Sequence, residues 1–169
     1  MVAVAMAEES ERGVRIERPN RDKASSKATR LIVIVLLLAS AGLMIIVSIG
    51  GWDAIEGAKM VQVAYIVVYL VLAFFVMRWS RGVLPLAAAL AIVLLIFAAV
   101  STPAWYSRDA DGFTDPALPA GVLGLLTAIL VPVQALLIAF AMRGFAQGWN
   151  VEVERREDEP RGRPQPAPA

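Results

Sequence analysis

The chain of 169 residues contains no cysteine and no histidine. Without cysteine it forms no disulfide and offers no thiolate to a metal ion, and without histidine it lacks the side chain that most often serves as a metal ligand or general base near neutral pH. Charge is also scarce, since 18% of the residues are charged and 58% are hydrophobic. Basic and acidic residues nearly balance, to a net charge of +1, which argues against a nucleic-acid-binding protein.

Four long stretches contain no charged residue: residues 31–50, 60–77, 82–102 and 118–142. The hydrocarbon core of a bilayer is about 30 Å thick and needs about 20 helical residues to cross it. A helix of a soluble protein keeps a polar face, and these stretches have none. The pattern therefore predicts an all-α integral membrane protein, an antiparallel bundle of four transmembrane helices surrounded by the lipid bilayer.

The two ends of the chain differ in composition from the spans. Residues 1–30 carry mixed charge, and residues 144–169 carry mixed charge and become rich in proline after Glu159. Segments of this kind bury too little apolar surface to fold alone. We expect the N- and C-terminal tails to be disordered.

Basic residues predict the orientation of the bundle. Seven of the sixteen Lys and Arg residues precede the first span, two lie between the second and third, and five follow the fourth, whereas the other two connections hold one each, Lys59 and Arg108. Because Lys and Arg favour the cytoplasmic side, both termini are predicted to be cytoplasmic, with the plasma membrane as the expected location. Trp52, Trp79 and Trp105 fall at predicted helix ends, as expected for an aromatic belt.

Small and polar residues predict which helix faces point inward, because small residues let helix backbones approach closely. At about 100° per residue, one face of the fourth span differs clearly from the opposite face. The first face holds Ala120, Gly124, Thr127, Ala128, Gln134, Ala135 and Ala141, and the second holds Leu125, Leu126, Ile129, Leu130, Val133, Leu136, Leu137 and Phe140. We expect the first face to pack inward, with Ala120, Gly124 and Ala128 as its helix-packing residues. In the second span Ala73 shares a face with three polar residues, opposite Val67, Val68, Val71 and Phe75, and in the third Ala87, Ala91, Ala98 and Thr102 form a small stripe.

Polar side chains on the inward faces of the second and fourth spans form a candidate polar seam. Its members are Gln62, Tyr65, Tyr69, Thr127 and Gln134. Tyr69 and Gln134 differ in depth by roughly 6 Å, an offset that a tyrosine side chain covers. Since both are costly in hydrocarbon when unpaired, we expect them to point into one bundle interior. There they would bond to each other, to Thr127, or to a carbonyl freed by Pro132.

Pro132 lies inside the fourth span, where it removes a backbone hydrogen bond and clashes with the carbonyl of Ala128. We expect a helix kink near residues 128–132. The kink could serve function, as a hinge or by exposing a carbonyl to a binding pocket. The alternative is a static bend in which neighbouring groups satisfy the freed carbonyl.

Acidic residues cluster in the 103–119 connection. Asp109, Asp111 and Asp115 surround Gly112, which superficially suggests a calcium loop. An EF-hand needs glycine at its sixth position and glutamate at its twelfth, and this segment has neither. Asp and Gly are ordinary turn residues, so no metal or cofactor is predicted.

The spans contain no Asp, Glu, Lys or Arg, which are the residues that usually mark an ion path, proton path or buried active site. An enzyme is therefore not expected. The small multidrug transporters resemble this chain in size and span number, but they depend on a carboxylate in the first helix, and residues 31–50 contain none. The sequence favours a non-catalytic component that associates with another membrane protein or with itself. The alternative is a carrier or channel for a small neutral or lipophilic solute, using the polar seam.

Overall fold

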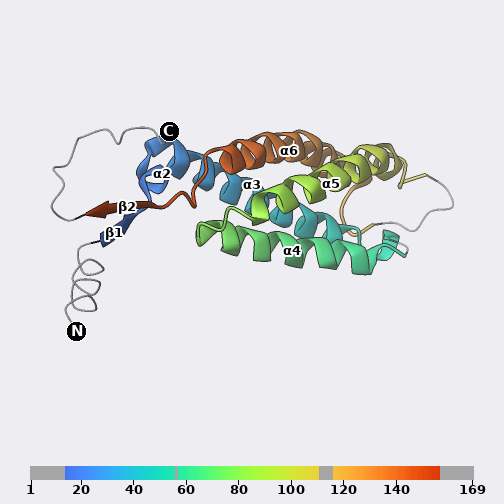
Figure 1. Ribbon diagram of the computed structural model, residues 1–169. Helices are drawn as coiled ribbons and strands as arrows, with labels where there is room; N and C mark the ends of the chain where they lie inside the picture. Colours follow the sequence, from blue (N-terminus) through green and yellow to red (C-terminus); the bar gives the residue numbers. More distant parts are fainter. Residues whose placement is uncertain (1–13, 56, 111–115, 157–169) are drawn as a thin grey trace, which may run out of the picture.

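The computed structural model describes residues 14–55, 57–110 and 116–156. Its main elements are four long helices: α3 (Ala24–Gly50), α4 (Lys59–Met77), α5 (Val83–Tyr106) and α6 (Ala120–Ala146). Each is long and apolar enough to cross a membrane, which confirms the predicted helical membrane fold. The helices run alternately in opposite directions along one bundle (Figure 1).

α3 and α5 extend beyond the stretches that lack charge, and α6 also does so at its end, where it passes Arg143 to reach Ala146. α3 begins at Ala24 because residues 24–30 contain no glycine or proline; Ser25 and Lys27 are exposed there, whereas Ser26 and Thr29 are buried against the bundle. α5 continues through Pro103 to Tyr106. Proline there removes one N–H near the helix end, where the loss is small compared with a break in the middle of the span. Apolarity alone therefore underestimates helix length at these positions.

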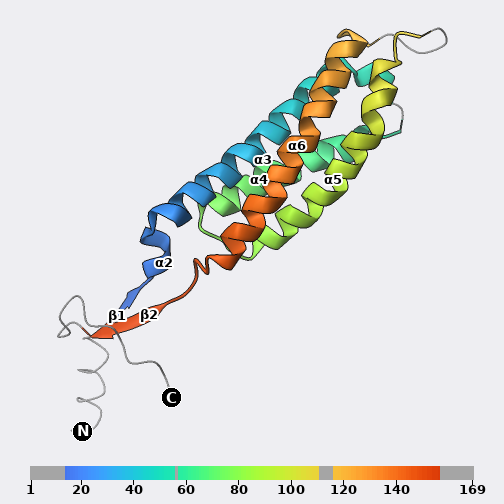
Figure 2. The same ribbon diagram turned by 90° about the horizontal axis from the view of Figure 1, so that it is seen from above.

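The ends of the chain form structure where disorder was expected. β1 (Val14–Glu17) pairs in antiparallel register with β2 (Val153–Arg156), so that Ile16 lies opposite Glu154. A short helix, α2 (Pro19–Asp22), joins β1 to α3. We call the β1–β2 pair the terminal ribbon, and it projects beyond the bundle (Figures 1 and 2). The parts of the predicted tails at 1–13 and 157–169 lie outside the described residues.

The bundle therefore has two distinct ends. The ribbon end carries the terminal ribbon and the turn between α4 and α5, and the loop end carries the connections from α3 to α4 and from α5 to α6 (Figure 2). A one-turn 3-10 helix, η1 (Trp52–Ala54), lies in the first of those connections.

Close packing of small residues holds α5 against α6, the most extensive helix contact in the structure. Ala87, Ala91 and Ala98 of the predicted small stripe are buried. On α6 Gly124 faces the ring of Tyr106, where a Cβ atom would lie 2.8 Å from ring carbons. Ala120 is buried as predicted, and Ala128 is half-buried. Small side chains thus let these two helices approach closely.

The predicted inward face of α6 is partly wrong. Leu130 and Leu137, expected to face lipid, are buried, whereas Ala135 is exposed. The buried positions alternate at spacings of three and four residues, and α6 packs against both α3 and α5. Leucine fills the centre of the bundle, where alanine would leave a void, and alanine on a lipid-facing surface costs little.

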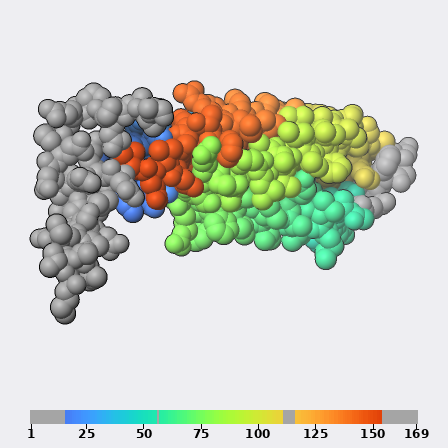
Figure 3. Space-filling model, viewed as in Figure 1, coloured from blue at the N-terminus to red at the C-terminus, as the bar shows by residue number. Residues whose placement is uncertain are grey.

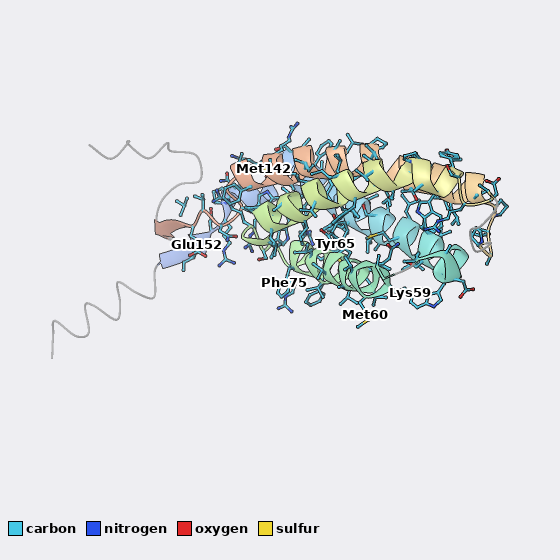
Figure 4. All side chains as sticks on the ribbon, turned by 90° about the vertical axis from the view of Figure 1, so that its right-hand side faces the viewer. Lys59, Met60, Tyr65, Phe75, Met142 and Glu152 are labelled. Atoms are coloured by element: carbon cyan, nitrogen blue, oxygen red, sulfur yellow. The ribbon has the colours of Figure 1, made fainter. Side chains whose placement is uncertain are left out.

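α4 is the least buried of the four spans. It packs along α3 but makes few contacts with α5. Val67, Val68, Val71 and Phe75 are exposed, as predicted, and Figure 4 shows Phe75 pointing away from the bundle. α4 and α5 diverge toward the loop end (Figure 1). Figure 3 shows α6, α5 and α4 as adjacent bands on one face.

Candidate functional site

Three buried polar side chains form a network in the middle of the bundle. The Tyr69 hydroxyl donates to Gln134 Oε1 at 2.9 Å, and Gln134 Nε2 donates to Ser40 Oγ at 2.8 Å. Ser40 Oγ in turn donates to the Leu36 carbonyl at 2.7 Å. All three side chains are fully buried, and we call them the polar triad. The predicted meeting of Tyr69 and Gln134 is present, and Ser40 is a third member that the sequence did not indicate.

The polar triad joins three helices, because Ser40 lies on α3, Tyr69 on α4 and Gln134 on α6. A polar group without a partner costs several kcal/mol in hydrocarbon, so mutual hydrogen bonds are the condition for burying these side chains. The chain of bonds ends on a carbonyl of α3 itself. The arrangement is that of an internal connection between helices, with its polar atoms directed at one another.

The other members of the predicted seam do not join the triad. Thr127 Oγ1 donates to the Leu123 carbonyl of its own helix at 2.8 Å. Gln62 Nε2 lies 3.5 Å from the Met44 carbonyl of α3, and Tyr65 is half-buried with its ring 5.9 Å from that of Tyr69. The five residues therefore do not form one continuous seam. Gln62 and Tyr65 belong to a separate feature nearer the loop end.

Pro132 does not interrupt α6, which is helical from Ala120 to Ala146. Its side chain is exposed on the outside of the bundle, away from the polar triad. The carbonyl of Ala128 takes no part in the hydrogen bonds of Tyr69 or Gln134. The predicted kink, and any role for it, stays a prediction.

A cavity of about 590 Å³ lies between α4 and α5 at the loop end, a size within the range of small-molecule sites. We call it the α4–α5 cleft. Met44 of α3 contributes to its wall, and the residues that follow η1 and start α4 line its end. Figure 4 shows Tyr65 on the side of α4 that faces α5, and Met60 on the side that faces away. The cleft is mainly apolar, and its polar side chains are Gln62, Tyr65, Ser101 and Arg108.

Tryptophan and basic side chains pair at the loop end. Lys59 Nζ lies 5.0 Å from the ring centroid of Trp52, and Arg108 Cζ lies 5.9 Å from that of Trp105. Trp52 is exposed, as in an aromatic belt, but Trp105 is buried in a small cluster with Val47, Ala54, Ile55 and Leu123. Trp105 thus lies at a helix end, as predicted, but its ring packs into the bundle and does not face lipid. Its ring packs on Gly51, where a Cβ would overlap it.

A second cluster of arginine and tryptophan closes the ribbon end. Trp149 is fully buried, and its ring meets that of Trp79 edge to face at 5.4 Å. Arg30 Cζ lies 4.5 Å from the Trp79 ring centroid, and Arg30 donates to the carbonyls of Val76 and Met77 at the end of α4. A cation at a helix C-terminus is favourable because the last carbonyls carry partial negative charge.

The same cluster fixes both ends of the chain to the bundle. Arg21 Nε donates to the Trp149 carbonyl at 3.1 Å, and Asn20 Nδ2 donates to the Gly148 carbonyl at 3.1 Å. Arg81 Nε donates to the Phe145 carbonyl at 2.7 Å. Burial lowers the pKa of Arg21, with Arg18 adding to that effect and Glu152 opposing it. The end of α6 and the segment after it are thus held by side chains from α2, α3 and the α4–α5 turn. We call these side chains, together with Trp149, the arginine–tryptophan collar: Asn20, Arg21, Arg30, Trp79, Arg81 and Trp149.

Sequence reasoning missed this collar because each residue had a simpler interpretation. Arg21, Arg30 and Arg81 were counted for orientation, and Trp79 was assigned to the aromatic belt. Trp79 adopts φ of 62°, an uncommon conformation for a side chain of its size, and is half-buried. One signal in the sequence could have indicated the collar: an arginine or a tryptophan lies beside each helix end on the side of the membrane where both termini are predicted.

The acidic connection gives no metal site in the described part of the chain. There, no three acidic side chains lie close enough together to hold a metal ion. Asp109 is exposed, and Asp111, Gly112 and Asp115 lie outside the described residues. No protein-family model, curated protein or solved structure matches this chain.

Proposed function

We propose that the protein is a non-catalytic membrane component that binds a partner membrane protein through its terminal ribbon. The four helices serve as the anchor, and the ribbon is the docking element. The distribution of Lys and Arg supports a cytoplasmic ribbon end, and the plasma membrane is the location that we propose.

The closed interior supports a role without catalysis or transport through the bundle. Between their ends the four long helices carry no Asp, Glu, Lys or Arg side chain, and the polar groups of the triad bond to one another. A catalytic or transport site usually directs a polar or charged group at a space that a ligand enters. The triad residues do not face a space of this kind, because all three are completely buried.

The single observation that carries the proposal is the burial of Trp149 and its anchoring by the collar. A tail that merely dissolves in water needs no buried tryptophan and no set of hydrogen bonds from three other segments. Gln147 Nε2 donates to Thr29 Oγ1 at 3.0 Å, and Gln147 Oε1 accepts from Trp149 Nε1 at 3.0 Å. These contacts bring residues on either side of the bundle domain together and direct them into one ribbon.

The ribbon itself favours a partner. Two strands alone are marginally stable in water, and among the described residues no third strand adds to either edge of the ribbon. Addition of a strand from a partner satisfies such an edge. An ion pair between Arg18 and Glu152, with Arg18 Nε 2.9 Å from Glu152 Oε1, holds the two strands where they leave the bundle.

Native mass spectrometry of the protein extracted in a mild detergent tests this role. Ile16→Pro removes a backbone donor from β1, whereas Ile16→Thr keeps a β-branched residue and serves as the matched control. We expect a stoichiometric partner subunit with the original chain and with Ile16→Thr, and its loss with Ile16→Pro while the helices remain folded. A second copy in place of another protein selects self-association. A bare monomer, or equal retention with Ile16→Pro, contradicts the proposal.

A carrier for a small neutral or lipophilic solute is the second candidate, because the α4–α5 cleft is large enough for a ligand. If the polar triad is part of a transport path, Gln134→Leu abolishes flux into proteoliposomes while the bundle stays folded. Unchanged flux with Gln134→Leu, or no flux with the original chain, removes this candidate.

A further inference from the structure

The α4–α5 cleft has the length of one membrane leaflet. On α5 its wall runs from Leu94 to Trp105, eleven residues apart, or about 16 Å along the helix at 1.5 Å per residue. Half of the hydrocarbon core is about 15 Å thick. The cleft begins at the loop end, where α5 ends and α4 begins, and reaches as far as Tyr65. It therefore spans the hydrocarbon of the leaflet at the loop end and stops near the bilayer centre.

The cleft opens sideways, toward lipid. α4 and α5 diverge on this side of the bundle (Figure 1), and apolar residues on both margins are exposed. Val100 is 71% exposed, Phe97 55% and Val61 52%. A molecule dissolved in the bilayer can enter between these margins without crossing water. An apolar entrance of this kind excludes a hydrophilic ligand.

Polar groups sit at one end of the cleft and along one side. Arg108, half-buried just after α5, lines its loop end at the depth where lipid headgroups begin. A guanidinium carries five N–H donors and binds phosphate in a bidentate manner. Deeper in the cleft, the Ser101 hydroxyl is bonded to the Phe97 carbonyl at 2.7 Å and Gln62 Nε2 lies 3.5 Å from the Met44 carbonyl, so apart from Tyr65 the deeper wall is mainly apolar. The cleft thus combines a cationic end with an apolar channel.

We propose that the α4–α5 cleft binds one phospholipid, with an acyl chain between α4 and α5 and its phosphate at Arg108. The length and the mainly apolar wall favour an acyl chain over a helix of another protein, because a helix is about 10 Å across and the cavity would enclose only a short part of one. An acyl chain is thinner and matches both the leaflet-deep length and the apolar wall. This site is independent of the terminal ribbon, which lies at the opposite end of the bundle.

The test uses two variants that act on different parts of the lipid. Ala104 lines the cleft, so Ala104→Phe fills it, and Ala99→Phe on the exposed opposite side of α5 is the matched control. Arg108→Gln removes the cation, and Arg78→Gln is its control, since Arg78 lies at the ribbon end with Cζ 5.7 Å from the Phe74 ring. Delipidated protein is mixed with micelles containing equal amounts of dioleoylphosphatidylglycerol and dioleoylglycerol, and bound lipid is counted by native mass spectrometry.

We expect one phosphatidylglycerol per chain and at least tenfold less dioleoylglycerol, because a charge-assisted hydrogen bond contributes enough for a tenfold change in affinity. Ala104→Phe loses both lipids, Arg108→Gln lowers phosphatidylglycerol to the level of dioleoylglycerol, and both controls bind as the original chain does. Equal binding of the two lipids shows that the phosphate is not recognised. Several lipids per chain, unaffected by Ala104→Phe, or a protein subunit that is lost with Ala104→Phe, overturns the proposal.

Discussion

Replacing Gln134 by leucine removes the residue that bonds both other members of the polar triad. Gln134 accepts from Tyr69 and donates to Ser40, at 2.9 and 2.8 Å. Ser40 keeps its own hydrogen bond to the Leu36 carbonyl in the variant, because that bond does not involve Gln134. The Tyr69 hydroxyl, fully buried, loses the acceptor that it has in the structure. The cost of Gln134→Leu therefore falls mainly on Tyr69.

The size of the effect follows from two estimates. Two side-chain hydrogen bonds within a membrane contribute about 0.6 kcal/mol each, which gives about 1.2 kcal/mol as the lower value. Leaving a buried donor without a partner costs about 1–3 kcal/mol, which gives the upper value. We expect Gln134→Leu to lower the free energy of unfolding by about 1–3 kcal/mol.

In a double-mutant cycle, the effect of Tyr69→Phe on the free energy of unfolding should change sign between the original chain and the Gln134→Leu background. In the original chain Tyr69→Phe removes one hydrogen bond and leaves the buried Gln134 Oε1 without its donor, so it lowers stability by about 0.6–3 kcal/mol. In the Gln134→Leu background the same substitution removes the stranded hydroxyl, so it raises stability. Unfolding is followed by tryptophan fluorescence during titration of sodium dodecyl sulfate into mixed micelles, since Trp79 and Trp149 are 5.4 Å apart and report on the packed state.

The reasoning fails if Tyr69→Phe lowers the free energy of unfolding equally in both backgrounds. Equal effects mean that Tyr69 and Gln134 act independently, and the triad then has no role in joining α4 to α6. Ser40→Ala is a useful third variant, because it removes the acceptor of Gln134 Nε2 without changing the bond from Tyr69.

Further substitutions test the packing and the orientation. Gly124→Leu is expected to reduce the yield of folded protein severely, whereas Ile129→Leu, at a 40% exposed position, has little effect; similar losses from both would contradict the close contact at Gly124. Ser26→Ala should raise the free energy of unfolding by about 1 kcal/mol, because the buried Ser26 hydroxyl has no hydrogen-bond partner in the described structure, and a decrease would show that it has one. In a chain without native cysteine, Ala110→Cys should react with an impermeant maleimide on intact cells and Ser25→Cys should not, and the reverse pattern would invert the predicted orientation.

The sequence predicted the spans because length and lack of charge are local properties. It also brought Tyr69 and Gln134 together, since a helical period and a similar depth place two polar side chains on facing surfaces. Ser40 was not predicted, because a serine in a span can satisfy its hydroxyl on its own helix and gives no signal of a partner. Ser40 does both, donating to Leu36 and accepting from Gln134.

What sequence reasoning missed depends on contacts between distant segments. The register of Ile16 with Glu154 links two short charged strands whose local composition favours disorder. The burial of Leu130 and Leu137 depends on α6 having neighbours on two sides, which the small-residue pattern does not reveal. The α4–α5 cleft arises from the divergence of two helices, and no single helix encodes that angle.

The proposed docking element is tested most directly by disulfide cross-linking of the terminal ribbon in membranes. Ile16 and Glu154 are paired in register, so cysteines at these two positions lie within disulfide distance on one face of the ribbon. The control pair, Ile16→Cys with Arg155→Cys, is shifted by one residue and points to opposite faces. We predict rapid intramolecular cross-linking of Ile16→Cys with Glu154→Cys, little of the control pair, and no protection by an impermeant maleimide added to intact cells. Equal cross-linking of both pairs, or full protection by the impermeant reagent, would contradict an ordered cytoplasmic ribbon.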